Sequence, residues 1–214
     1  GSNLVTGIMP FDTWTHFKLD TDNSTEKFSL EIGGNPVYTD MPYNEAGLGH
    51  DFSGWPLDRL EWENTAGNDV FFDNVAYAGI VEPTPTFSQN FEPPFATADL
   101  NIVPWSVLYG TPSVIAGGPS PSTNCVELNA AAGGDEVQLI LAPEDQFEQG
   151  TVELDLYIGS GGTFRLTARD NHPSAWRIAR LYFRDGGTAV DIATSLVGSN
   201  LVTGIMPFDT WTHF

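Results

Sequence analysis

Apolar and polar residues alternate along much of this chain, as they do in strands that bury one face. In residues 151–158 every second position, from Val152 to Ile158, is aliphatic. This period of two predicts a β-strand with one face in the core. The same pattern, bounded by turn residues, predicts further strands at residues 14–20, 27–32, 36–38, 58–63, 70–77, 137–141, 163–169, 176–184 and 189–194.

Composition extends this picture to an all-β fold. The chain has 22 glycines, 15 prolines and 12% aromatic residues, which suits short strands joined by tight turns. Long amphipathic helical stretches are missing, so we expect almost no helix. This many strands requires two packed sheets, and the predicted fold class is a two-sheet antiparallel β-sandwich.

Residues 1–17 and residues 198–214 have the same sequence, GSNLVTGIMPFDTWTHF. An identity of this length does not arise by convergence, and a strand position in a fold holds only one copy. We interpret the chain as one permuted period of a tandem-repeat array, with a circularly permuted single domain as the alternative. We therefore expect that the chain's ends are not a domain's ends. We also expect one copy to pair with a neighbouring chain or to stay outside the fold.

Residues 80–86, with the sequence IVEPTPT, are the best candidate for a linker, because their two prolines favour extended chain that does not continue a sheet. Residues 1–79 are then the C-terminal part of one repeat, and residues 87–214 are the N-terminal part of the next. A linker of this length spans at most about 24 Å. The two parts either close into one permuted sandwich or belong to successive repeats.

Two segments carry a resemblance to a known fold family. Residues 14–20 and 28–37 resemble the W-x-H-f-x-l-d … f-x-l-x-i-d-G hairpin of laminin-G-like, concanavalin-like jelly-roll domains. Residues 90–92 and 72–75 are similar to the first and last strands of jelly-roll carbohydrate-binding modules. The resemblance covers nearly the whole period and implies a jelly roll. Because those modules hold a structural calcium ion between these strands, it also implies Ca²⁺ ligands at Glu92 and Asp73.

A second acidic segment, residues 20–26, imitates the start of a calcium loop. It lacks the glycine and the distant glutamate of an EF-hand, so we interpret it as a solvated turn. The same segment contains the sequon Asn23-Ser24-Thr25, which makes Asn23 a glycosylation candidate on an exposed turn. The histidines are scattered along the chain, and we read none of them as a zinc ligand.

The formal net charge of −20, from 28 acidic and 8 basic residues, limits the partners of the chain. Such a surface repels nucleic-acid phosphates and anionic membranes, and its natural small partners are cations. Because of this charge we expect no nucleic-acid binding. No apolar run is long enough to span a membrane, so we also expect no membrane insertion. Cys125 is the single cysteine. We expect a buried free thiol, with a disulfide between repeats as the alternative.

Most of the basic residues are concentrated in one window of the chain, at Arg165, Arg169, Arg177, Arg180 and Arg184. By alternation, Arg165 shares a face with Arg169, and Arg180 shares a face with Arg184. One interpretation is a sheet face that binds an acidic glycan through guanidinium groups. Aromatic side chains would then stack on the sugar rings, the candidates being Tyr157, Trp176 and Tyr182.

Two other interpretations of the arginines remain open. If residues 159–162 close a hairpin, Glu153 lies opposite Arg169 and Tyr157 lies opposite Arg165, as ordinary cross-strand pairs. Alternatively, the arginines contact the acidic surface of a neighbouring copy.

Residues 151–157 also resemble the E-x-D-x-E strand of retaining β-glycanases, in which alternating carboxylates face one cleft. Alternation places Glu153 and Asp155 on one face. Tyr157 stands where the second glutamate would act as acid/base, so this chemistry lacks a partner. We therefore do not expect an enzyme, and glycoside hydrolysis is a distant third candidate.

Duplication and charge together predict a non-catalytic structural role. Sandwiches joined by short linkers form a string of beads, and contacts that do not close into a ring produce a filament. We expect a calcium-stabilised repeat of an extracellular or cell-surface filament, sheath or adhesin, whose partners are other copies of itself. The alternative is a carbohydrate-binding module of a secreted multidomain protein, with an acidic polysaccharide as ligand.

Overall fold

The computed structural model describes residues 2–9, 12–43, 49–80, 86–129, 134–159, 161–185 and 190–195, with side chains between Asp12 and Phe183 in these ranges. The strands of the first part of the chain are β1 (Ser2–Met9), β2 (Thr15–Asp22), β3 (Lys27–Ile32), β4 (Asn35–Pro42), β5 (Leu57–Ala66), β6 (Val70–Gly79) and β7 (Thr86–Gln89). Then follow β8 (Trp105–Tyr109), β9 (Ser113–Ala116), β10 (Asn124–Leu128), β11 (Asp135–Ile140), β12 (Gln149–Ile158), β13 (Thr163–Asp170), β14 (Arg177–Asp185) and β15 (Val190–Ser195).

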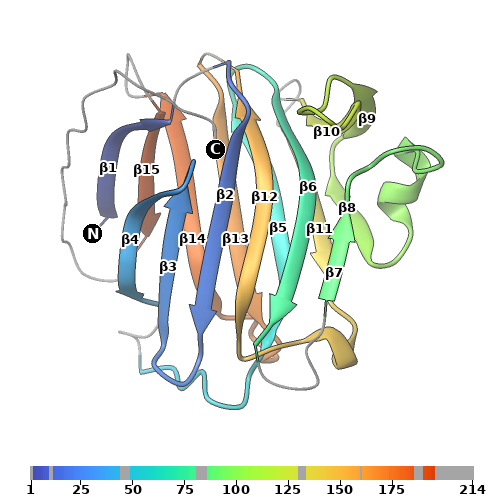
Figure 1. The fold of residues 1–214 in the computed structure, drawn as a ribbon. Helices are drawn as coiled ribbons and strands as arrows, with labels where there is room; N and C mark the ends of the chain where they lie inside the picture. Colours follow the sequence, from blue (N-terminus) through green and yellow to red (C-terminus); the bar gives the residue numbers. More distant parts are fainter. Residues whose placement is uncertain are drawn as a thin grey trace.

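These strands form two antiparallel sheets packed face to face, so the predicted fold class is confirmed (Figure 1). Within the described residues, one sheet has the order β1-β15-β14-β13-β5-β11-β8. The other has the order β4-β3-β2-β12-β6-β10-β9, with β7 paired to β6. We call them the β13 sheet and the β12 sheet. Two short 3₁₀ helices, η2 (Thr97–Asn101) and η4 (Pro143–Asp145), are the helical elements of the described chain. No described helix has the length and apolar character to cross a membrane.

Strands from before and after residues 80–86 alternate within both sheets. In the β12 sheet, β12 lies between β2 and β6, and in the β13 sheet, β5 lies between β13 and β11. The two parts of the chain therefore share one core in this structure. The central linker residues, 81–85, lie outside the described residues.

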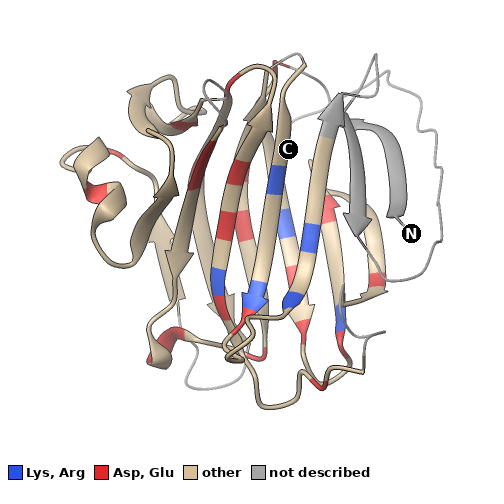
Figure 2. Ribbon diagram, turned by 180° about the vertical axis from the view of Figure 1, so that it is seen from behind, with Lys and Arg blue, Asp and Glu red and all other residues tan. Residues whose placement is uncertain are grey.

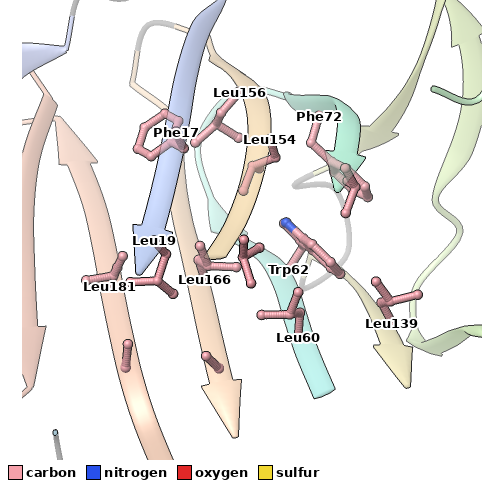
Figure 3. Close-up of a cluster of buried hydrophobic side chains, with 14 of the residues drawn as sticks. Phe17, Leu19, Leu60, Trp62, Phe72, Leu139, Leu154, Leu156, Leu166 and Leu181 are labelled. Carbon is pink, nitrogen blue, oxygen red and sulfur yellow. The ribbon is translucent and has the colours of Figure 1, made fainter. Parts of the chain in front are cut away.

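The core lies between the sheets and follows from the alternation of each strand. On β12, Val152, Leu154, Leu156 and Ile158 are all buried, whereas the residues between them are partly exposed. Trp62 of β5 is fully buried and stacks on Phe72 of β6 with ring centroids 5.1 Å apart. Figure 3 shows Trp62 and Phe72 among leucines of both sheets, which include Leu154 of β12 and Leu166 of β13.

The strands expected from strong alternation are present with small shifts of their ends. β8, β9 and β10 were not expected, because these short strands lie in a segment rich in proline and turns. The expected hairpin at residues 159–162 is wrong. The segment leads from β12 in one sheet to β13 in the other, so it is a crossover between the sheets.

Candidate functional site

All six arginines of the chain lie in three neighbouring strands of the β13 sheet, at Arg59, Arg165, Arg169, Arg177, Arg180 and Arg184. In Figure 2 the blue positions along β5, β13 and β14 are arginines, since both lysines of the chain lie on β2 and β3. Their inward side chains fill the core, so alternation directs the polar residues outward. We call the outward group formed by Glu61, Glu63, Arg165, Arg169, Arg180 and Tyr182 the arginine face.

Glutamates of β5 pair with arginines of β13 across this face. Glu63 lies directly opposite Arg165 in the register and forms an ion pair with it. Arg169 donates from Nε to Glu61 at 2.8 Å. The side chains of both glutamates are only 10% exposed. These pairs replace the expected pairing of Glu153 with Arg169 and of Tyr157 with Arg165, since β12 lies in the other sheet.

Tyr182 of β14 provides an aromatic surface close to two guanidinium groups. The Arg180 guanidinium lies 5.4 Å from the Tyr182 ring centroid, and that of Arg165 lies 5.9 Å from it. Burial and the nearby Arg165 charge lower the pKa of Arg180 below its ordinary value. Arg165, Arg169 and Arg180 thus gather on one face of a chain whose net charge is −20, and Glu63 and Glu61 offset the charge of the first two.

Glu136 of β11 extends this face beyond the glutamates of β5. It lies opposite Glu63 in the register. Burial, followed by the Glu61 charge, raises the pKa of Glu136, while Arg169 and Arg180 oppose the shift. The sequence interpretation missed Glu61, Glu63 and Glu136, although the alternation in β5 already placed Arg59, Glu61 and Glu63 on one side.

The aromatic residues proposed for the same glycan site are not brought together. Tyr157 lies on the β12 sheet, where its hydroxyl donates to Asp12 at 3.3 Å and its ring packs near Trp14. Trp176 lies in the connection between β13 and β14, stacked between the rings of His172 and His50 at 3.6 and 4.1 Å. Only Tyr182 accompanies the arginines, and the side chain of Arg184 lies outside the described residues.

Asp73 of β6 is a buried carboxylate beside a bulge in the β6–β12 pairing. It is 0% exposed, and neither carboxylate oxygen has a hydrogen-bond partner within normal geometry. Burial raises its pKa to about 6, and the charges of Asp155 and Glu92 add to this, while Asn74 N–H and the Ser122 hydroxyl oppose it. A carboxylate in this position is one that a bound cation would stabilise.

Glu92 already stabilises a turn near Asp73. Its Oε1 accepts hydrogen bonds from the backbone N–H groups of Thr123 and Asn124, and its Oε2 accepts one from the Thr123 hydroxyl. These bonds lower the pKa of Glu92. Glu92 is therefore ionised and fixed in position, although part of its accepting capacity is used.

The fit to calcium rests mainly on Asp73. Among the residues that the structure describes, no three His, Cys, Asp or Glu side chains are grouped to hold a metal ion. Calcium takes six to eight oxygen ligands and accepts backbone carbonyls and water among them. Asp73 and Glu92 would supply the charged ligands, and neutral oxygens would have to supply the others.

The acidic segment at residues 20–26 forms the turn between β2 and β3, as the sequence indicated. Asp22 Oδ1 accepts bonds from Ser24 N–H, the Ser24 hydroxyl, Thr25 N–H and the Gln149 amide. Although burial opposes the shift, these bonds lower the pKa of Asp22 to about 2. The carboxylate organises the turn by accepting these four bonds.

Replacing Asp22 with asparagine is expected to destabilise the sandwich by about 1 kcal/mol at pH 7, because a neutral amide oxygen accepts these bonds more weakly. The folded pKa is depressed, so this stability is present above pH 4 and is lost as the pH falls towards 2. In urea unfolding, the native chain should be more stable than Asp22→Asn at pH 7, and this difference in stability should disappear at pH 2. Equal stabilities at pH 7 would contradict this role.

Asn23 is not on an exposed turn, and that expectation is wrong. Its side chain is 1% exposed, and its amide donates to the Trp55 carbonyl at 2.7 Å while accepting from the Tyr43 hydroxyl. The turn packs against the segment that precedes β5, which covers the amide. Asn23 is therefore inaccessible to glycosylation in the folded sandwich.

The polar side chains of β12 lie beside residues of the neighbouring strands β2 and β6. Glu153 lies between Lys18 and Ala76 in the register, and Asp155 contacts His16 at 2.9 Å and accepts from the Asn74 amide at 2.7 Å. The Asp155 hydrogen bond raises the pKa of His16. Cys125 is buried, as expected, and burial raises its pKa to about 12.

The chain matches no family model, and no curated protein matches it.

Proposed function

We propose that this protein is a structural repeat of an extracellular or cell-surface array, built from acidic jelly-roll sandwiches that associate with other copies of themselves. The observation that carries the proposal is the 17-residue identity of residues 1–17 and 198–214. The described fold is compatible with a jelly roll. In an array of identical beads, every copy presents the same surfaces to its neighbours.

The arginine face supports contact between copies. It gathers cationic groups on one sheet of a body whose 28 acidic residues outnumber its 8 basic ones. Because Glu61 and Glu63 offset the charge of Arg169 and Arg165, this face is far less acidic than the remainder of the surface, and the acidic remainder of one copy can approach it on the next copy in a heterologous, non-closing manner. Calcium at Asp73 and Glu92 would stabilise each bead and would not perform chemistry.

Sedimentation velocity at increasing salt tests this contact. The native chain should self-associate at low salt, and Arg180→Gln should weaken the association about tenfold, because it removes a cation from the face. Lys18→Gln, on the outer side of the β12 sheet, is the matched control and should change it little. A chain that stays monomeric at all concentrations, or equal effects of both substitutions, would refute the contact.

An acidic polysaccharide is the second candidate for the same face. Its support is the position of Tyr182 beside two guanidinium groups, since such groups bind carboxylate or sulfate while the ring stacks on a sugar. Heparin and alginate serve as probes in calorimetry. Binding by a monomeric chain, lost in Arg180→Gln, would favour this function over the array.

A further inference from the structure

Exposed apolar side chains gather along the β8 edge of the β13 sheet. Figure 1 shows β8 at the side of the sandwich away from β1. Five of the six large hydrophobic side chains that are exposed among the described residues lie here, namely Ile102, Val103, Leu108, Tyr109 and Ile140. Ile140 of β11 belongs to this group because its N–H donates to the Pro104 carbonyl at 2.8 Å. We call these five residues the apolar edge. A contiguous exposed group of this kind marks an interaction site.

The chain around the apolar edge is nearly free of charge. Residues 93–126 contain a single charged side chain, Asp99, although the whole chain has 28 acidic and 8 basic residues. Asp99 accepts a hydrogen bond from Ala96 N–H at 2.7 Å, at the start of η2. The centres of protein interfaces are likewise depleted of charge. A cationic partner would be attracted to the acidic surfaces elsewhere. A second acidic copy is repelled by those surfaces, and it approaches an uncharged edge with the least repulsion.

The backbone of β8 ends its sheet with an open side. Within the described strands, β8 pairs with β11 alone. Edge strands are commonly protected from self-association by charges, by proline or by a bulge. β8 has a bulge at Leu108 but contains no charge and no proline, and residues 105–107 pair regularly with β11. The outer side of this strand can therefore pair with a further strand.

We propose that two copies of this chain pair through the apolar edge about a two-fold axis, with their β8 strands antiparallel and the β13 sheet continuous across both copies. A two-fold contact uses the same surface twice, so both of its sides are apolar and uncharged. Pairing along the whole of β8 places Val107 opposite Val107 of the second copy. Residue 108 then lies about 7–8 Å diagonally from residue 108 of that copy. This contact goes beyond the proposed array contact, because it is isologous and does not use the arginine face.

The salt dependence of the β8 contact should be opposite in sign to that of the arginine face. Salt at about 1 M shortens the Debye length to about 3 Å, so it screens the repulsion between two chains of charge −20. The burial of apolar side chains does not need that repulsion or any ion pair. Sedimentation equilibrium should therefore show a dimer fraction that rises with salt. A chain that is monomeric at this salt concentration would overturn the proposal, even if the arginine face associates at low salt.

A charge at position 108 should break the dimer. Leu108→Glu places like charges across the axis and removes apolar contact, so the dissociation constant at high salt should rise about tenfold. Ile80→Glu is the matched control, because Ile80 is 67% exposed and follows β6 of the other sheet. It should leave the dissociation constant unchanged. Equal effects of the two substitutions would overturn the proposal.

A mixture of oppositely charged variants tests the two-fold axis and shows that the variants are folded. Leu108→Glu and Leu108→Lys are each combined with Arg180→Gln, which weakens the arginine-face contact, at about 0.15 M salt, where the Debye length is about 8 Å. Each variant alone should be largely monomeric, whereas the equimolar mixture should dimerise, because the charges at position 108 are then opposite. A mixture that associates no more than the separate variants would overturn the two-fold pairing. These outcomes do not depend on the arginine face, so the two proposals fail separately.

Discussion

Replacing Asp73 with asparagine is expected to stabilise the protein in chelator at pH 7.5 and to abolish its response to calcium. The folded pKa of Asp73 is about 6, against an ordinary value of 3.8. Between these values the folded state retains a proton that the unfolded state has released. The stability present below pH 4 is therefore lost as the pH rises through 6, at a cost of about 2–3 kcal/mol.

If Asp73 is a calcium ligand, added calcium should offset the lower stability of the native chain relative to Asp73→Asn. A ligand at one hundred times its dissociation constant stabilises the folded state by about 2.7 kcal/mol. The native chain should therefore gain stability with added calcium, whereas Asp73→Asn should not. Denaturant unfolding at several pH values, with chelator and with calcium, measures both effects.

Asp40→Asn is the matched control for this experiment. Asp40 is an exposed aspartate of β4 with φ of 50°, a conformation that asparagine tolerates. Its substitution should change neither the pH dependence nor the calcium response. A calcium response that survives in Asp73→Asn would show that the ion binds elsewhere.

Removing Glu63 is expected to destabilise the sandwich by about 3 kcal/mol, because it leaves the Arg165 guanidinium on a largely covered face without this counter-ion. The Glu63 side chain is 10% exposed and that of Arg165 is 21% exposed, so water screens the pair poorly. Glu63→Ala and Arg165→Ala together should cost less than the sum of the single changes. A coupling of about 1–2 kcal/mol is expected from a double-mutant cycle.

An exposed pair on the other sheet provides the comparison. Lys18 and Asp20 contact each other at 3.0 Å, but their side chains are 33% and 38% exposed. Their double-mutant cycle should yield less than about 1 kcal/mol. Additive effects of Glu63→Ala and Arg165→Ala would contradict the interpretation of this face as a network of ion pairs.

Alternation predicted the strands well because burial of one face is recorded in every second residue. β12 illustrates this, since its predicted span of 151–158 became Gln149–Ile158. The alternation within a strand does not indicate which other strands are its neighbours in the sheet. Residues 159–162 join two strands that are adjacent in sequence, and glycines permit either a hairpin or a crossover. Their placement in different sheets is decided by packing of the whole chain, and this separated Tyr157 from the arginines.

The candidate site was predictable where it depends on strand faces alone. Arg165, Arg169 and Arg180 lie together on one face, whereas their partners Glu61 and Glu63 come from a strand about one hundred residues earlier. No local pattern indicates such a pairing. Asn23 illustrates the same limit, because its burial comes from Tyr43 and the Trp55 carbonyl. A sequon is a local pattern, and it does not indicate whether distant parts of the chain bury its asparagine.

Electron microscopy of the native protein, in calcium and without chelator, tests the central claim most directly. The account predicts regular filaments or sheets with one sandwich as the repeating unit, which loosen when salt or chelator is added. Dispersed single sandwiches under all of these conditions would contradict it.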